Sequence, residues 1–63
     1  HLAGRAEPGV ARVVLHLRDA DLALISWATD GQFEFDSVRH GLIRLSLERQ
    51  EPGPAVWTDW FRV

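Results

Sequence analysis

Hydrophobic and polar residues alternate along much of this chain of 63 residues. In residues 12–18, Val13, Leu15 and Leu17 fall on one side, and the other side is mostly polar. Successive side chains of a β-strand point to opposite faces, so a period of two residues indicates a strand with one buried face. The β-branched content of the segment favours the same conclusion.

Four further segments have strand-like patterns, and residues 2–6 form a weaker candidate. The four segments are residues 22–29, 32–36, 42–48 and 55–63. Phe33 and Phe35 share one face of their segment, and Ile43, Leu45 and Leu47 share one face of theirs. These apolar faces are the candidate core.

Turn residues separate the predicted strands. Asp30-Gly31 favours a hairpin turn, because Gly adopts the positive φ that other residues avoid. Arg39-His40-Gly41 is interpreted as the next turn, and residues 50–54 form a loop in which two prolines prevent a strand from continuing. Strands that recur about every 8–12 residues are typical of a sandwich or a small barrel. We therefore expect an all-β chain that forms a small antiparallel β-sandwich of about 6–7 short strands.

The composition limits the class of protein. We expect residues 1–63 to form a single domain, because a chain of this length is too short for two. Because the chain has no Met, we also expect it to be the C-terminal part of a longer protein. The absence of Cys excludes disulfides and thiolate metal sites. All seven basic residues are Arg, which suggests a high-GC bacterial coding sequence. The net charge of -2 is spread along the chain, which argues against a nucleic-acid partner.

Targeting signals are also missing from this sequence. No apolar run approaches the roughly 18 residues that a membrane-spanning helix requires, so no membrane partner is expected. No basic start followed by an apolar stretch resembles a signal peptide. These two features favour a cytoplasmic location.

The segment from Ala28 to Leu45, ATDGQFEFDSVRHGLIRL, resembles the carboxypeptidase regulatory-like (transthyretin-like) domains. In that family a Thr-Asp-x-x-Gly-x-Phe-x-Phe strand precedes a Pro-x-Gly turn and an alternating strand. Residues 2–6 resemble the first strand of the family, and residues 56–61 resemble the last strand of its small high-GC bacterial versions. The chain departs from the pattern in a shorter Asp–Gly spacing and in Arg39-His40 at the Pro position. The resemblance implies that the sandwich is transthyretin/prealbumin-like and that the chain is a non-catalytic accessory module attached to a larger protein.

The candidate catalytic and metal-binding residues form no recognisable pattern. Three isolated histidines with no nearby ligand pair do not predict a zinc site. Ser26, Ser37 and Ser46 could supply a hydroxyl, and His16 or His40 a base, but no Gly-x-Ser-x-Gly elbow is present. The acidic residues lack the spacing of a calcium loop. We predict no enzyme activity, no catalytic residues, no metal and no cofactor.

The tryptophans are the better candidates for function. Trp57 and Trp60 point to opposite faces if their segment is one continuous strand. We expect Trp57 to join the core with Phe61 and the other phenylalanines, and Trp60 to be the exposed ring. The candidate partner-binding residues are Trp60, Val56, Arg62 and Thr58.

Three functions follow as hypotheses. The first is a non-catalytic interaction domain that presents a sheet face or an edge strand to a protein partner, or to the rest of its parent protein. The second is a small carbohydrate-binding module that uses Trp27 or Trp60 as a stacking surface. The third is self-association, with a homo-oligomer formed through edge strands.

Overall fold

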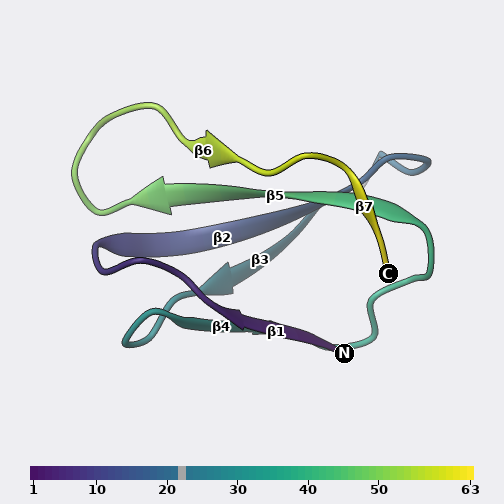
Figure 1. Cartoon of the computed structure of the whole chain (residues 1–63), viewed down its shortest axis with the longest axis horizontal. Coiled ribbons are helices and arrows are strands. Elements are labelled where there is room, and N and C mark those ends of the chain that lie inside the picture. The colour runs from purple at the N-terminus through teal and green to yellow at the C-terminus, as the bar shows by residue number, and fades with distance from the viewer. Residues whose placement is uncertain (22) are drawn as a thin grey trace.

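A computed structural model describes residues 1–21 and 23–63 of the chain. Those residues form seven strands and contain no helix (Figure 1). The strands are β1 (Leu2–Arg5), β2 (Val10–Leu17), β3 (Ala23–Trp27), β4 (Gln32–Phe35), β5 (Leu42–Arg49), β6 (Val56–Trp57) and β7 (Phe61–Arg62). The all-β prediction is confirmed. Leu22, where the third segment was predicted to begin, lies outside the described residues.

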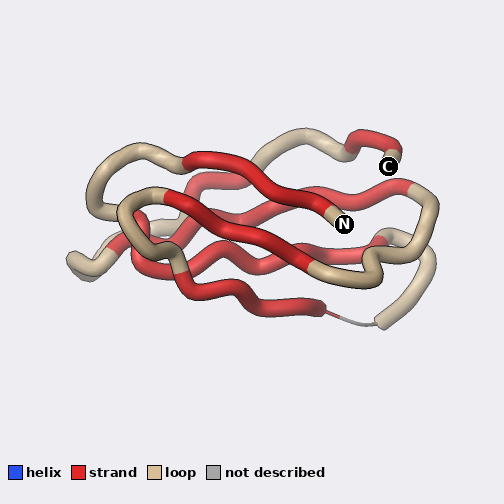
Figure 2. Tube along the Cα trace, turned by 90° about the horizontal axis from the view of Figure 1, so that it is seen from below, coloured by secondary structure: helices blue, strands red, loops and turns tan. Residues whose placement is uncertain are grey.

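The strands form two antiparallel sheets. The larger sheet has the order β3-β2-β5-β6, and β7 pairs with the other end of β5. The smaller sheet consists of β1 and β4. Figure 2 shows these two strands lying across the larger sheet. This arrangement is consistent with the predicted β-sandwich, and it covers one face of the larger sheet.

The long pairing of β2 with β5 provides the centre of the core. Leu15 pairs with Leu45, and Leu17 pairs with Ile43, so their side chains share the covered face. Leu15, Ile43 and Val13 have no exposed surface. The buried cluster comprises Val10, Val13, Leu15, Phe35, Ile43 and Leu45. The alternation in the sequence therefore identified most of this core.

The Asp30-Gly31 turn is confirmed and takes the chain from one sheet to the other. Asp30 and Gly31 both have positive φ, at 52° and 79°, which is the combination found in a type I′ hairpin turn. Thr29 and Gln32 close the turn with two backbone hydrogen bonds of 2.9 and 3.0 Å. The next strand, β4, then pairs with β1 in the smaller sheet.

Three local features differ from the sequence predictions. Val10 is buried because the register shifts between Val10 and Arg12, and this irregularity brings an extra residue to the covered face. Residues 36–41 do not close a hairpin, since they connect β4 in the smaller sheet to β5 in the larger one. The predicted strand 55–63 is interrupted, because residues 58–60 separate β6 from β7.

Candidate functional site

The larger sheet has a second face that β1 and β4 do not cover. Its residues follow from the register: Arg12 pairs with both Trp27 and Glu48, and Ser46 pairs with Trp57, so these side chains share the face opposite the core. We call it the outward face. Its main residues are Arg12, Val14, His16, Ile25, Trp27, Arg44, Ser46, Glu48, Trp57, Trp60 and Arg62.

All three tryptophans of the chain lie on the outward face. Trp27 is 70% exposed, Trp57 is 50% exposed and Trp60 is 38% exposed. Ile25, beside Trp27 on β3, is 55% exposed. Large apolar side chains left open on one face of a small domain are typical of an interaction surface. The outward face is therefore the strongest candidate site.

Arg44 is held between two of these tryptophans. It projects outward from β5 between the core residues Ile43 and Leu45. Its Cζ lies 4.4 Å from the centroid of the Trp57 ring and 4.6 Å from that of Trp60. Both distances are within the range of a cation–π contact. We call this arrangement the Arg44 clamp.

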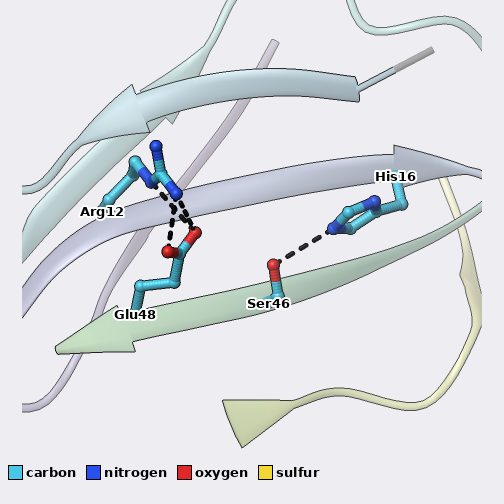
Figure 3. A network of polar contacts seen from close by, with 4 residues as sticks. All are labelled: Arg12, His16, Ser46 and Glu48. Carbon is cyan, nitrogen blue, oxygen red and sulfur yellow. Dashed lines mark hydrogen bonds and ion pairs between the residues drawn. The ribbon is translucent and has the colours of Figure 1, made fainter. Parts of the chain in front are cut away.

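His16 and Ser46 occupy the middle of the outward face (Figure 3). His16 Nε2 lies 3.1 Å from Ser46 Oγ, and the imidazole ring lies 4.9 Å from the ring of Trp57. Burial lowers the pKa of His16, and the charge of Arg44 lowers it further, while Glu48 opposes the shift. At neutral pH the imidazole is therefore uncharged.

Arg12 and Glu48 form the polar margin of the same face (Figure 3). Arg12 Nη2 lies 2.6 Å from Glu48 Oε1, and Arg12 Nε donates to Oε2 at 2.9 Å. This hydrogen bonding to Glu48 raises the pKa of Arg12. Arg12 also lies 5.9 Å from the centroid of the Trp27 ring. The only outward carboxylate on the described strands is thus already bound by an arginine.

The predicted partner-binding residues divide between the two faces. Trp60 and Arg62 lie on the outward face, but Val56 pairs with Leu47 and belongs to the opposite one. Thr58 has a structural role, because its Oγ1 accepts a hydrogen bond of 2.9 Å from the backbone N–H of Leu45. The four residues therefore do not form a single patch.

The prediction that Trp57 belongs to the core is wrong. Trp57 is half exposed, and its expected core partner Phe61 is 37% exposed. The prediction assumed a continuous strand, in which Trp57 and Trp60 point to opposite faces. The interruption at residues 58–60 resets the alternation, so both rings reach Arg44 on the same face. Sequence reasoning also missed Arg44, which carried no signal beyond its place in an alternating strand.

The contact between His16 and Ser46 does not form a hydrolase site. A serine nucleophile needs access to substrate and a third group that orients the histidine. Ser46 is only 3% exposed, and the carboxylate of Glu48 is held by Arg12. Across residues 1–21 and 23–63, no group of three or more His, Cys, Asp or Glu residues could hold a metal ion. The outward face is therefore better suited to binding than to catalysis.

A shallow hollow of about 900 Å³ lies next to the outward face along β3. Ile25 and Trp27 line it on one side, and Arg5, Gln32 and Glu34 are among the residues that line the other. β3 is the outermost strand of the larger sheet, so its second edge has no strand partner among the described residues. Trp27 is therefore accessible both from the outward face and from this hollow.

No family model, curated protein or solved structure matches the chain. The resemblance to carboxypeptidase regulatory-like domains therefore stays a prediction from the residues that carry it. Within the described part of the chain, no helix has the length and apolar character needed to cross a membrane. The functional proposal below is therefore based on the residues of the outward face.

Proposed function

We propose that this chain is a non-catalytic binding module of the accessory type, and that it presents the outward face to a protein partner. The observation that carries the proposal is that all three tryptophans lie on one uncovered sheet face, between 38% and 70% exposed. Trp and Arg are the residues that most often dominate binding energy at protein interfaces. The outward face combines both.

The layout of the face fits that of a protein interface. Trp57, Trp60 and Arg44 form a packed group at one side, and Ile25 and Trp27 add an apolar area at the other. The polar groups near the centre, His16 and Ser46, are hydrogen-bonded to each other. An apolar surface with satisfied polar groups loses little hydrogen bonding when a partner excludes water.

A carbohydrate ligand is the second candidate, since three tryptophans on one face could form a stacking platform. Two observations make it weaker. The Trp57 ring already contacts the Arg44 guanidinium and the His16 ring, which reduces the ring surface left for a sugar. Four of the neighbouring polar side chains are hydrogen-bonded in pairs, Arg12 with Glu48 and His16 with Ser46, and are therefore less available to a sugar. Titration with soluble polysaccharides should leave tryptophan fluorescence unchanged, and a saturable response would favour this candidate instead.

Self-association is the third candidate, because the outer edge of β3 could pair with another copy. Sedimentation across a concentration series separates it from the proposal. We expect a monomer at all concentrations, because the proposed partner is a different protein. A dimer whose population rises with concentration would favour self-association instead.

A random-peptide display selection on the immobilised chain tests the proposal. Selected peptides, titrated into ¹⁵N-labelled protein, should shift the indole N–H signals of Trp57 and Trp60. Trp60→Ala should weaken their binding about tenfold, as expected for a central aromatic anchor. Val56→Ala is the matched control, because Val56 is 53% exposed but lies on the opposite face. Peptides that bind equally well to both variants would contradict the proposal.

A further inference from the structure

Arg44 differs from the other outward-facing arginine near the centre of the sheet, Arg12, in having no carboxylate partner among the described residues. Arg12 is paired with Glu48, and Arg49 is paired with Glu7, whereas Arg44 takes part in no ion pair among the described residues. Its Nε is buried without a hydrogen-bond acceptor in that part of the chain. Burying a donor is unfavourable unless an acceptor replaces the water it has lost. The Arg44 guanidinium thus lies against two rings and has no carboxylate partner among the described residues.

The Arg44 clamp prepares the guanidinium for a carboxylate. Stacking uses the flat faces of the guanidinium, so its N–H groups stay in the plane where a carboxylate binds two of them at once. The Arg44 Cζ lies 4.4 Å from the centroid of the Trp57 ring and 4.6 Å from that of the Trp60 ring, so two rings restrict the movement of the guanidinium. The rings also displace water, and attraction between opposite charges is stronger where water is excluded.

The charge on the outward face points to an acidic ligand. Arg12, Arg44 and Arg62 project from this face, and Glu48 is the one carboxylate among its strand residues described by the structure. The face therefore carries a net charge of +2 (three Arg less one Glu), although the whole chain carries -2. Arg62 pairs with Leu42, so it is a diagonal neighbour of Arg44. Two cations side by side without a carboxylate favour an anion between them.

We propose that the ligand of the outward face is an acidic peptide segment of the partner protein, with an Asp or Glu carboxylate bound by Arg44 between Trp57 and Trp60. This inference rests on the proposed function, because it identifies which group of the partner docks there. A protein segment fits better than an acidic polysaccharide. Val14 and the exposed Ile25 give the same face an aliphatic area, which suits apolar side chains next to the acidic residue.

Titration of a capped deca-glutamate peptide into ¹⁵N-labelled protein tests the inference. We expect the Arg44 Nε–H signal and the indole signals of Trp57 and Trp60 to shift together as the peptide is added. The shifts should become smaller at higher salt concentration, because salt screens the attraction between the charges. Capped deca-glutamine should cause no shift. Arg44→Gln should raise the dissociation constant about tenfold, and Arg44→Lys should raise it as well because it lacks the planar fork. Arg39→Gln, at an exposed position in the 36–41 connection, is the matched control.

Each other outcome overturns a stated part of the inference. If Arg44→Gln and Arg39→Gln bind deca-glutamate equally well, Arg44 is not part of the binding site. If Arg44→Lys binds it as tightly as the unchanged protein, a clamped guanidinium is not required. Oligogalacturonate that binds more tightly than deca-glutamate, with the same dependence on Arg44, would replace the peptide by a polysaccharide. Display-selected peptides that bind the outward face without acidic residues would refute this inference and leave the proposed function intact.

Discussion

The Arg44 clamp makes a measurable contribution to stability, which a double-mutant cycle isolates. The perturbations are Arg44→Gln, the pair Trp57→Ala and Trp60→Ala, and all three changes combined. A cation–π contact contributes about 0.5–1 kcal/mol at an exposed site and about 2 kcal/mol when desolvated. Arg44 is half-buried and contacts two rings, at 4.4 and 4.6 Å. We therefore expect a coupling free energy of about 1–2 kcal/mol between Arg44 and the two rings.

Urea unfolding followed by far-ultraviolet circular dichroism provides the assay, because the backbone signal remains in every variant, including those without Trp57 and Trp60. A chain of this size has little stability to lose, so all variants are compared in the same concentration of sucrose. The control is the coupling between Arg44 and Trp27, which are two strands apart across the sheet and four residues apart along it, a separation of roughly 16 Å. That coupling should be close to zero. Equal couplings for Trp27 and for the Trp57–Trp60 pair would refute the clamp.

Three other predictions test the turn, the β5–Thr58 contact and the titration of the face. Gly31→Ala should lower the free energy of unfolding by more than about 1 kcal/mol, because φ is 79° and a Cβ would lie 2.8 Å from the Ala6 carbonyl oxygen. Gly53→Ala is the control in the same urea titration and should have little effect, because a Cβ there meets nothing within 4 Å. Thr58→Val should cost about 1–3 kcal/mol, since it removes the acceptor of the Leu45 N–H, and a loss below about 0.3 kcal/mol would contradict this. Because folding lowers the pKa of His16, the unfolded chain binds more protons than the folded chain near pH 6. The free energy of unfolding should therefore be unaffected by His16 above the usual histidine pKa of about 6.5 and should decrease as the pH falls below that value. His16→Gln should flatten this part of the pH dependence, and an unchanged slope would contradict the assignment.

The fold could be predicted from the sequence because its signals are local. Alternation placed Val13 and Leu15 in the core, and Asp30-Gly31 defined a turn that the backbone confirms with two positive φ values. The position of Val10 could not be predicted in this way. Its burial depends on an irregularity in the pairing with β5, which the alternating pattern of a single strand does not reveal.

The candidate site was harder to predict because it depends on long-range pairing. Trp60 was identified as an exposed ring, but Trp57 was assigned to the wrong face since the strand interruption between them has no strong sequence signal. Arg44 belongs to the site only because β6 and β7 both pair with β5, which brings Trp57 on β6 and Trp60 just before β7 to its side chain. A single sequence does not specify which strands become neighbours in the sheet.

The two faces of the larger sheet have different roles. The covered face holds Leu15 and Ile43, which have no exposed surface and stabilise the fold. The outward face buries only its central residues, Val14 and Ser46, at 8% and 3% exposure, and leaves the rings around them open. The open rings are therefore available to a partner, which is what a separate binding face requires.

The central claim is that all three tryptophans lie on an uncovered face. Fluorine NMR of 5-fluorotryptophan-labelled protein tests it most directly, because the solvent isotope shift between H₂O and D₂O reports the exposure of each ring. After assignment by single Trp→Phe substitutions, all three signals should shift, most for Trp27, less for Trp57 and least for Trp60, in the order of their 70%, 50% and 38% exposure. A Trp57 signal without any isotope shift would place that ring in the core and contradict the account.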